Sequence, residues 1–499
     1  MGSLLDTAID APEVREYDVE AVNRKETRPP LYVPRKKIHP RRAHGFFRTF
    51  KWWVMAATLG IYYVTPWLRW DRGPGAPDQA VLVDIPGRRF YFFFIEIWPQ
   101  EFYYIAGLLI MAGLGLFLVT SVVGRAWCGY ACPQTVWTDL FIWVERLVEG
   151  DRGARIRLDK EPMSGAKATK RLAKYVIWLL IAMGTGGAWV FYFADAPTLL
   201  VDLVTGQAAT DAYATVGVLT FTTFTLGGFM REQVCTYMCP WPRIQAAMMD
   251  EESLTVTYRT DRGEPRKPFE KNADWDTRGD CIDCKACVVV CPMGIDIRDG
   301  QQLECITCAL CIDACDDVMA KVGKPRGLID YVTLQDEAIE TQGAAPIPLS
   351  KRILRPRTIL YFVMWSAIGV GMMVSLFMRD SIDLTVARDR NPTFVVLSDG
   401  SIRNGYTIKV ANQNQEPHDF ILSFRSDLPL QAEIQGLEWL EFEVEADKLR
   451  QMRLFLTTLP FARPTERAEV EIWIEDQQTR ERVAVDTFFL APEPGDWGP

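Results

Sequence analysis

Five apolar stretches constrain the fold of this 499-residue chain more than any other feature. Each approaches the ~20 apolar residues that a helix needs to cross a bilayer. They lie at 52–68, 102–123, 175–194, 212–230 and 357–378. The first is short, but it carries Trp and Tyr at both ends and follows a basic run, as interfacial anchors do. Because lipid satisfies no backbone polar group, each span must be helical, and we predict an α-helical membrane protein with about five transmembrane helices.

The distribution of Lys and Arg predicts the orientation of these helices. Basic residues are frequent before residue 52 and in segments 125–174 and 231–356, whereas loop 195–212 has three Asp and no basic residue. The positive-inside rule therefore places the N-terminus in the cytoplasm, and five crossings place the C-terminus outside. Loop 69–101 carries Arg and fits the rule least well. The net charge of -9 gives no sign of a nucleic-acid surface.

All 12 cysteines fall on the predicted cytoplasmic side. Disulfides are rare in that compartment, so metal binding or thiol redox chemistry is the expected use. The three histidines, His39, His44 and His418, lie outside the apolar segments. This position excludes a membrane haem held by paired histidines.

Eight of the cysteines form two copies of C-x2-C-x2-C-x3-C. This is the bacterial ferredoxin spacing, in which three cysteines of one motif and the fourth of the other hold each [4Fe-4S] cluster. Zinc is the alternative metal for these cysteines. However, zinc favours separated Cys pairs, often together with His, and no His lies near these motifs in the sequence. Cys291 is followed by Pro292, as in ferredoxins, whereas Cys315 is followed by Asp316. The predicted ligands are Cys281, Cys284, Cys287 and Cys315 for cluster 1, and Cys305, Cys308, Cys311 and Cys291 for cluster 2.

The other four cysteines form two C-x3-C-P pairs, Cys128 with Cys132 and Cys235 with Cys239, each directly after a predicted membrane helix. A spacing of four places both thiols on one helical face, and the following proline is expected to end the helix. If the two helical hairpins pack alike, the four thiols converge. We assign them as catalytic and metal-binding residues, for copper or a further iron-sulfur cluster. Packing cysteines are the alternative, and Met238 offers an additional soft ligand.

The chain divides into five predicted parts. The last contains runs such as YTIKVAN and AEVEIWI, whose period of two predicts an immunoglobulin-like β-sandwich. No catalytic constellation is visible there, which favours a docking or stabilising module. The parts are a cytoplasmic tail (1–45), a four-helix membrane domain with both C-x3-C-P pairs (46–250), a cytoplasmic ferredoxin-like di-cluster domain (251–345), a fifth transmembrane helix (346–378) and an external β-sandwich (379–499).

Paired C-x3-C-P motifs, the segment CIDCKACVVVCPMGIDIRDGQQLECITCALCIDACD, a single helix and an outer β-domain occur here in this order. The layout resembles the cytochrome c oxidase accessory protein family, called CcoG, FixG or RdxA, over about residues 35–499. The resemblance implies a bacterial inner-membrane protein with a periplasmic C-terminus. It further implies a role in assembling the cbb3-type oxidase by reducing Cu(II) to Cu(I). The implied partners are oxidase assembly factors and copper-handling proteins, and a homodimer is one oligomeric state that this resemblance leaves open.

Two alternatives stay open beside the cupric reductase. The membrane half also resembles NapH-type quinol dehydrogenases, which would make the chain a quinol-oxidising electron conduit. That function needs a pocket and a proton acceptor near the inner surface, for which Asp139, Glu145 and Glu232 are candidates. The third hypothesis is a copper-binding scaffold whose clusters are structural. The residues alone predict electron transfer and soft-metal binding; the electron donor is unknown, and copper and the oxidase come from the resemblance.

Overall fold

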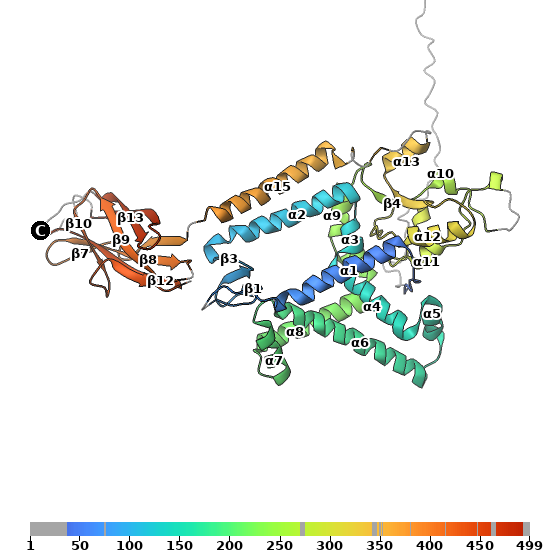
Figure 1. The fold of residues 1–499 in the computed structure, drawn as a ribbon, viewed down its shortest axis with the longest axis horizontal. Helices are drawn as coiled ribbons and strands as arrows, with labels where there is room; N and C mark the ends of the chain where they lie inside the picture. The colour runs from blue at the N-terminus through green and yellow to red at the C-terminus, as the bar shows by residue number, and fades with distance from the viewer. Residues whose placement is uncertain are drawn as a thin grey trace, which may run out of the picture.

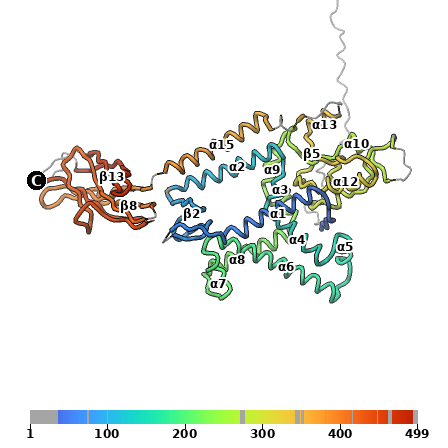
Figure 2. The backbone as a smooth tube through the Cα atoms, in the orientation of Figure 1, coloured from blue at the N-terminus to red at the C-terminus, as the bar shows by residue number. Residues whose placement is uncertain are grey.

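The computed structural model describes residues 37–492 apart from 74–75, 270–274, 342–346, 349–350, 352, 380, 415, 447 and 461–465. Most of the predicted tail 1–45 therefore lies outside the described residues. Figures 1 and 2 show a β-sandwich at one end of the molecule, long helices in the middle and a cysteine-bearing domain at the other end. The two extramembrane domains thus lie at opposite ends of the helices.

Four helical segments are long and apolar enough to cross a membrane. They are α2 (Tyr103–Val123), α6 (Gly165–Val190), α8 with its π-helical continuation (Thr210–Thr223 and Phe224–Met230) and α15 (Pro356–Phe377). The fifth predicted span also forms a helix, α1 (Phe46–Val64), which is not among the four. Its first turns contain Arg48 and Lys51, both buried in ion pairs with Asp139, so this end packs on protein instead of lipid.

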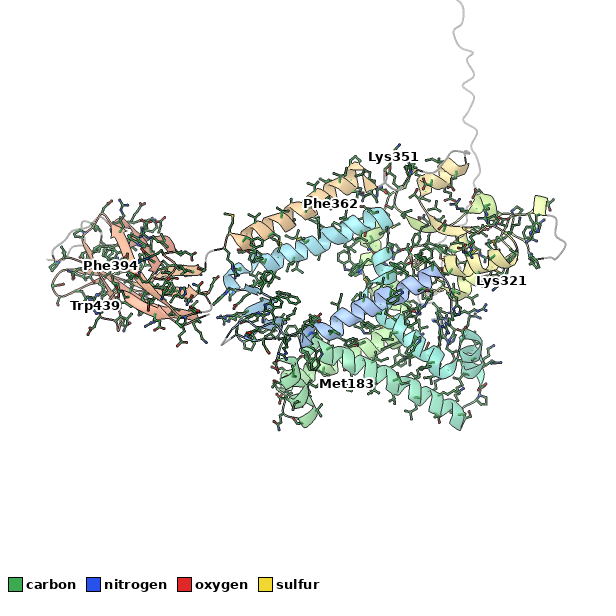
Figure 3. The ribbon with its side chains drawn as sticks, viewed as in Figure 1. Met183, Lys321, Lys351, Phe362, Phe394 and Trp439 are labelled. Atoms are coloured by element: carbon green, nitrogen blue, oxygen red, sulfur yellow. The ribbon has the colours of Figure 1, made fainter. Side chains whose placement is uncertain are left out.

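The four apolar segments expose their hydrophobic side chains. Phe362 on α15 is 55% exposed and Met183 on α6 is 49% exposed, and Figure 3 shows both on the outer faces of the helices. Large apolar side chains left outside a protein mark a surface that meets lipid or another protein. Inside the set, α15 packs on α2, and α6 packs on α8. The chain is accordingly a membrane protein.

Shorter elements connect these helices. On one side, loop 69–101 folds into a three-stranded antiparallel sheet, which the sequence analysis did not predict. On the side of the cysteine-bearing domain, short helices follow each C-x3-C-P pair. The strands are β1 (Val81–Asp84), β2 (Arg89–Phe92) and β3 (Ile95–Ile97), with α7 (Ala196–Thr205) on the same side; the helices on the side of the cysteine-bearing domain are α3 (Ala126–Tyr130), α4 (Pro133–Glu149), α5 (Arg152–Lys160) and α9 (Trp241–Met248).

The cysteine-bearing domain is closed by a two-stranded antiparallel sheet, in which Thr255 pairs with Val332 and Tyr258 with Ile329. Its core combines apolar side chains from these strands with cysteines and with Ile312 and Met319. Sulfur atoms are thus part of the core itself. The elements are β4 (Thr255–Tyr258), α10 (Thr260–Gly263), α11 (Ala286–Val290), α12 (Leu310–Lys321), β5 (Ile329–Val332) and α13 (Leu334–Thr341).

The C-terminal part is a β-sandwich, as the alternating runs predicted. One sheet has the order β10-β12-β8-β6, with β7 paired to β8, and the other has the order β11-β9-β13-β14. Inward-facing side chains such as Ile408, Leu454 and Ile472 are fully buried between them. The strands are β6 (Ile382–Arg388), β7 (Val395–Val396), β8 (Ile402–Asn412), β9 (His418–Ser426), β10 (Leu430–Ile434), β11 (Glu441–Val444), β12 (Lys448–Thr458), β13 (Arg467–Asp476) and β14 (Arg482–Leu490).

Candidate functional site: three groups of cysteines

The two ferredoxin motifs share an unusual backbone. In each motif the two residues that flank the second cysteine have a left-handed backbone, although neither is glycine. Asp283 and Lys285, around Cys284, have φ values of 48° and 55°, and Thr307 and Ala309, around Cys308, have φ values of 51° and 60°. Such a conformation costs on the order of 1–3 kcal/mol per residue and persists only where the surroundings enforce it. Backbones of this kind form concavities of N–H groups that bind anions, including iron-sulfur sites. The loops are therefore suited to an anionic cluster.

The fourth cysteine of each motif lies against the other motif. Burial, and then the sulfurs of Cys287, Cys284 and Cys281, raise the pKa of Cys315 to about 12. In the same way burial, then Cys308 and less strongly Cys305, raise the pKa of Cys291 to about 12. Each fourth cysteine therefore lies near the other motif, which is compatible with the crossed ligand sets that the spacing predicts.

The second group surrounds an apolar space. Cys291, Cys305, Cys308 and Cys311 line one small cavity together with Cys287 of the first group, and the rest of its wall is apolar, with side chains such as Ile306 and Leu310. A donor set made only of sulfur in apolar surroundings fits an iron-sulfur cluster and does not fit a hard cation. In the first group Cys281, Cys287 and Cys315 are buried, whereas Cys284 is exposed. In the second group Cys308 is buried and the other three are half-buried, so Cys284 is the cluster-motif cysteine most open to solvent.

The C-x3-C-P pairs differ from the prediction in their local structure. Cys128 lies in α3, but Cys132 stands at the break between α3 and α4 with ψ 128°, and Pro133 begins α4. Cys235 lies in a short π-helix, and Cys239 follows it with ψ 125°. The prediction of two thiols on one helical face is wrong, because the chain has already left the helix at Cys132 and Cys239, whereas the predicted break at each proline is present. A proline forces the preceding residue out of the helical region and suits the first turn of the next helix.

The four thiols of these pairs nevertheless lie close enough to shift one another's pKa values. Burial, and then Cys132, Cys128 and Cys239, raise the pKa of Cys235 to about 12. Cys132 and Cys239 also raise the pKa of Cys128, after burial as the main cause. We call Cys128, Cys132, Cys235 and Cys239 the four-thiol site. Met238, between the second pair, is 56% exposed, and in the described part of the chain no three His, Cys, Asp or Glu side chains are close enough to hold one metal ion.

The four-thiol site touches the second ferredoxin loop through backbone atoms. A Cβ added to Gly129 would lie 2.6 Å from the carbonyl oxygen of Ile306 and 3.0 Å from the Cα of Cys308. The hydroxyl of Tyr130 donates to the carbonyl of Cys308 at 3.2 Å. Cys235 and Ile306 also line a common small cavity. Both C-x3-C-P pairs therefore reach the loop that carries the second cluster motif.

Arg125 lies between the two groups of cysteines, and the sequence analysis did not single it out. Its side chain is 4% exposed and donates from Nη1 to the carbonyl of Leu303. Burial is the largest influence on the pKa of Cys128 and of Cys305 and raises both, while the guanidinium of Arg125 lowers both. One buried positive charge thus acts on both groups. Its position three residues before Cys128, as a charged residue at the end of an apolar run, was the available signal.

Gln245 is the second residue that the sequence analysis missed. It is 1% exposed on α9, and the thiol of Cys128 donates to its Oε1 at 2.9 Å. Its Nε2 donates to Thr120 Oγ1 at 3.3 Å, and that hydroxyl donates to the carbonyl of Leu116 at 2.7 Å. This chain of bonds sets the orientation of the amide. The signal in the sequence was a polar residue within the apolar helix that follows the second pair.

Two of the three predicted proton acceptors are locked in ion pairs. Asp139 accepts two hydrogen bonds from Arg48. Burial raises the pKa of Glu145, but the guanidinium groups of Arg231 and Arg155 outweigh burial and lower it to about 2. A carboxylate with so low a pKa stays ionised at neutral pH and is a poor proton acceptor. Glu232 is half-buried and lines the small cavity that also contains Cys235.

Three family models match parts of the chain. A 4Fe-4S binding domain matches residues 105–150, a 4Fe-4S dicluster domain matches 230–334, and the IG-like fold at the C-terminus of FixG matches 372–492. The two iron-sulfur matches together contain all 12 cysteines. The third match covers the β-sandwich.

Curated relatives match nearly the whole chain. The nitrogen fixation protein FixG of Rhizobium meliloti is 54% identical over 510 residues, covering 96% of this chain and 97% of the relative. Protein RdxB of Cereibacter sphaeroides is 57% identical over 463 residues, covering 92% and 97%. Protein RdxA of the same organism is 58% identical over 428 residues, covering 86% and 90%.

Proposed function

Because the chain belongs to the FixG/RdxA family of membrane-associated iron-sulfur electron-transfer proteins, we propose that it passes electrons from its ferredoxin domain to the four-thiol site and there reduces Cu(II) to Cu(I). In this proposal the Cu(I) supplies assembly of a cbb3-type cytochrome oxidase in the bacterial inner membrane. The partners are then oxidase assembly factors and copper-handling proteins. The iron-sulfur chemistry rests on the family, and copper and the oxidase are the proposed part.

Two groups of four cysteines would hold the clusters: Cys281, Cys284, Cys287 and Cys315, and Cys305, Cys308, Cys311 and Cys291. When bound, [4Fe-4S] clusters supply reversible one-electron transfer. The chain contributes loops with left-handed residues, backbone hydrogen bonds to Cys287, Cys291 and Cys305, and an apolar wall around the second group. Low polarity and hydrogen bonds to sulfur are the means by which a protein adjusts such a potential.

The contact of Gly129 and Tyr130 with the loop of Cys308 is the observation that carries the proposal. It supports an order in which the first group with its exposed Cys284, the second group and the four-thiol site follow one another. Arg125 adds a positive charge between the last two, which favours an electron on either side.

Copper is the substrate in this proposal. Cu(II) prefers nitrogen and oxygen ligands, whereas thiolates select Cu(I), so four converging thiols stabilise the reduced ion and make Cu(II) easier to reduce. Each reduction consumes one electron, Cu(II) + e⁻ giving Cu(I). Because metal-bound cysteine is a thiolate, binding also releases the thiol protons. The high pKa values of Cys128 and Cys235 mean that both protons are present before copper arrives.

A third iron-sulfur cluster at the four-thiol site is the second candidate. The match of a 4Fe-4S binding domain to residues 105–150, which contain Cys128 and Cys132, favours it. In that case the four thiols extend the electron path and copper meets the electron elsewhere.

Two cysteine double variants separate these functions. In anaerobically purified Cys284→Ser/Cys308→Ser protein, iron, the broad cluster absorption and copper reduction are expected to be lost. In Cys128→Ser/Cys235→Ser protein, iron and reduction by dithionite are expected to persist, while copper binding and copper reduction fall together. A loss of about four irons in the second variant would establish the third cluster instead.

Unchanged copper binding and reduction in the Cys128→Ser/Cys235→Ser protein would show that these thiols only pack. Copper binding that survives in the Cys284→Ser/Cys308→Ser protein, together with delivery of copper in cells, would favour the scaffold hypothesis. Each outcome is read from metal analysis and from a Cu(I)-specific chelator assay on the same preparations.

A further inference from the structure

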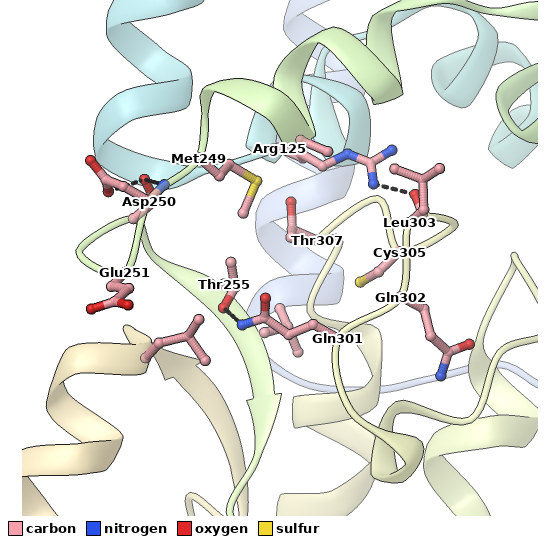
Figure 4. A pocket seen from close by; sticks show the side chains of 14 residues that line it. Arg125, Met249, Asp250, Glu251, Thr255, Gln301, Gln302, Leu303, Cys305 and Thr307 are labelled. Carbon is pink, nitrogen blue, oxygen red and sulfur yellow. Dashed lines mark hydrogen bonds between the residues drawn. The ribbon is translucent and has the colours of Figure 1, made fainter.

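A cavity of about 420 Å³ opens beside the second ferredoxin loop. Cys305 lines it, together with Arg125, Met249, Glu251, Gln301 and Thr307. Figure 4 shows the lining side chains: Arg125 from the segment after α2, Met249 and Glu251 from the segment between α9 and β4, and Gln301, Cys305 and Thr307 from the loop of the second motif. The volume lies within the ~300–1,000 Å³ of pockets that hold small organic molecules and is far larger than an ion needs.

The cavity lies where membrane helices end. Arg125 follows the end of the membrane helix α2 by two residues. Arg355, directly before α15, donates to Asp250, which also lines the cavity. A ligand that dissolves in the bilayer therefore reaches this space at the membrane surface. Its apolar wall includes Leu334, a 43% exposed residue at the start of α13.

Two polar side chains in the wall have unused hydrogen-bonding atoms. Arg125 is 4% exposed and its Nε has no partner; Thr307 is 3% exposed and its Oγ1 has none. Buried donors without a partner are costly, and each calls for a ligand, a water or an ion. Both belong to residues that line the cavity beside Cys305. A ligand with oxygen acceptors on a flat ring would use them after a small shift of either side chain.

We propose that this cavity is the site of the electron donor, and that the donor is a membrane quinol. The inference rests on the proposed electron transfer to the four-thiol site and names its source. Oxidation of one quinol gives one quinone, two protons and two electrons. The two ferredoxin clusters accept one electron each, which accounts for a pair of one-electron centres beside a two-electron donor. The protons leave to the exposed carboxylate of Glu251 and to water.

The position of Glu251 resolves a difficulty of the sequence analysis. Quinol oxidation needs a proton acceptor near the inner surface, and Asp139 and Glu145 are held in ion pairs away from this cavity. Glu251 is exposed and lines the cavity itself. The carboxylate that takes a proton is then also the one that passes it to solvent.

The test uses the purified full-length holoprotein with decylubiquinol as donor and decylubiquinone as ligand. Leu334→Trp places a large ring in the mouth of the cavity, and Met163→Trp makes the same change at a 77% exposed residue outside it. Decylubiquinone is expected to raise the melting temperature of the wild type and of Met163→Trp but not of Leu334→Trp. Decylubiquinol is expected to bleach the cluster absorption in the same two proteins only, while dithionite bleaches all three.

Thr307→Val removes one hydroxyl without changing the shape of the side chain. Loss of one hydrogen bond corresponds to about two- to tenfold weaker binding of decylubiquinone. Iron content is measured alongside, because Thr307 precedes Cys308. Equal binding and equal reduction in the wild type and Leu334→Trp would overturn the proposal, as would cluster potentials too low for a quinol to reduce.

Failure of this inference is distinguishable from failure of the proposed function. If dithionite-reduced protein converts Cu(II) to Cu(I) but decylubiquinol neither binds nor bleaches, the copper chemistry stands and the donor is a different molecule, such as a soluble protein that docks at Cys284. If decylubiquinol bleaches the clusters and copper is not reduced, the quinol site stands and the cupric reductase is wrong.

Discussion

Gly129 is the residue at which the segment of the four-thiol site contacts the loop of the second cluster motif, so a methyl group at this position pushes the two segments apart. Gly129→Ala would push the new Cβ against backbone atoms of Ile306 and Cys308, at 2.6 and 3.0 Å. Backbone cannot yield as a flexible side chain does, and overpacking of this kind costs about 1–3 kcal/mol. We expect iron content and bleaching by dithionite to persist while copper reduction slows, measured as the rate of Cu(I) formation from pre-reduced protein.

Gly153→Ala is the matched control for this change. Gly153 lies in α5, and nothing stands within 4 Å of its added Cβ. Alanine in a helix interior is favoured over glycine by about 0.5–1 kcal/mol, so this variant is expected to be at least as stable as the wild type and equally active. Equal rates in both variants would show that the contact at Gly129 does not matter for electron transfer.

Glu145 is the centre of a buried charge network. It accepts from Arg155 at 2.8 Å and from Arg231 at 2.7 Å, and its side chain is 3% exposed. Glu145→Gln leaves these cations without their counter-charge, and breaking a buried pair costs about 3–5 kcal/mol. We expect a large drop in the melting temperature of the solubilised protein. Glu475→Gln, in a surface pair with Arg482, is the control and should show no measurable loss.

The same network makes the stability of the folded protein depend on pH, and the direction of this dependence follows from the pKa of Glu145. The pKa of this carboxyl is lowered to about 2 in the folded protein. A lowered pKa contributes stability above the unfolded value of ~4.3. That contribution is expected to disappear as the pH falls from about 5 toward 2, and to be absent from the pH profile of Glu145→Gln.

At the scale of elements, the β-sandwich has a core that is separate from the cysteines. Leu454 on β12 is fully buried and stands opposite Tyr406 on β8. Leu454→Ala removes buried methyl groups and is expected to destabilise the sandwich by about 2–5 kcal/mol. Limited proteolysis of the full-length protein should then cleave the sandwich faster, while iron content and copper reduction stay unchanged.

Val396→Ala is the control for the sandwich variant, because Val396 on the short strand β7 is 54% exposed. Its proteolysis rate should equal that of the wild type. If Leu454→Ala lowers copper reduction at full iron content, then the sandwich acts on the redox centres and is not a separate module.

At the scale of the whole molecule, the arrangement of the domains makes a topological prediction. The cysteine-bearing domain and the β-sandwich lie at opposite ends of the long helices, as Figure 1 shows. If the helices span the membrane, these domains face opposite compartments. Together with the distribution of Lys and Arg, this predicts that a reporter fused after Gly323 is cytoplasmic and one fused after Pro499 is periplasmic. The same compartment for both would contradict the proposed topology.

The sequence by itself determined the features that depend on local pattern. Long apolar runs imply helices because lipid satisfies no backbone group, and alternating runs implied the strands of the β-sandwich because successive side chains of a strand face opposite sides. The spacing of eight cysteines implied two clusters, since a tight loop sets which sulfurs are neighbours. The membrane assignment, the β-sandwich and the family of this chain followed from these patterns.

Only the tertiary structure decided what depends on contacts between distant segments. Local spacing placed Cys128 and Cys132 on one helical face, but packing of two hairpins around a break at Pro133 sets where the four thiols meet. The bond from Cys128 to Gln245 joins residues far apart in the chain, and Arg125 reaches the Cys305 loop in the same way. The cavity beside that loop has walls from four separate segments. No sequence period encodes such meetings, because they arise when the helices and loops pack together.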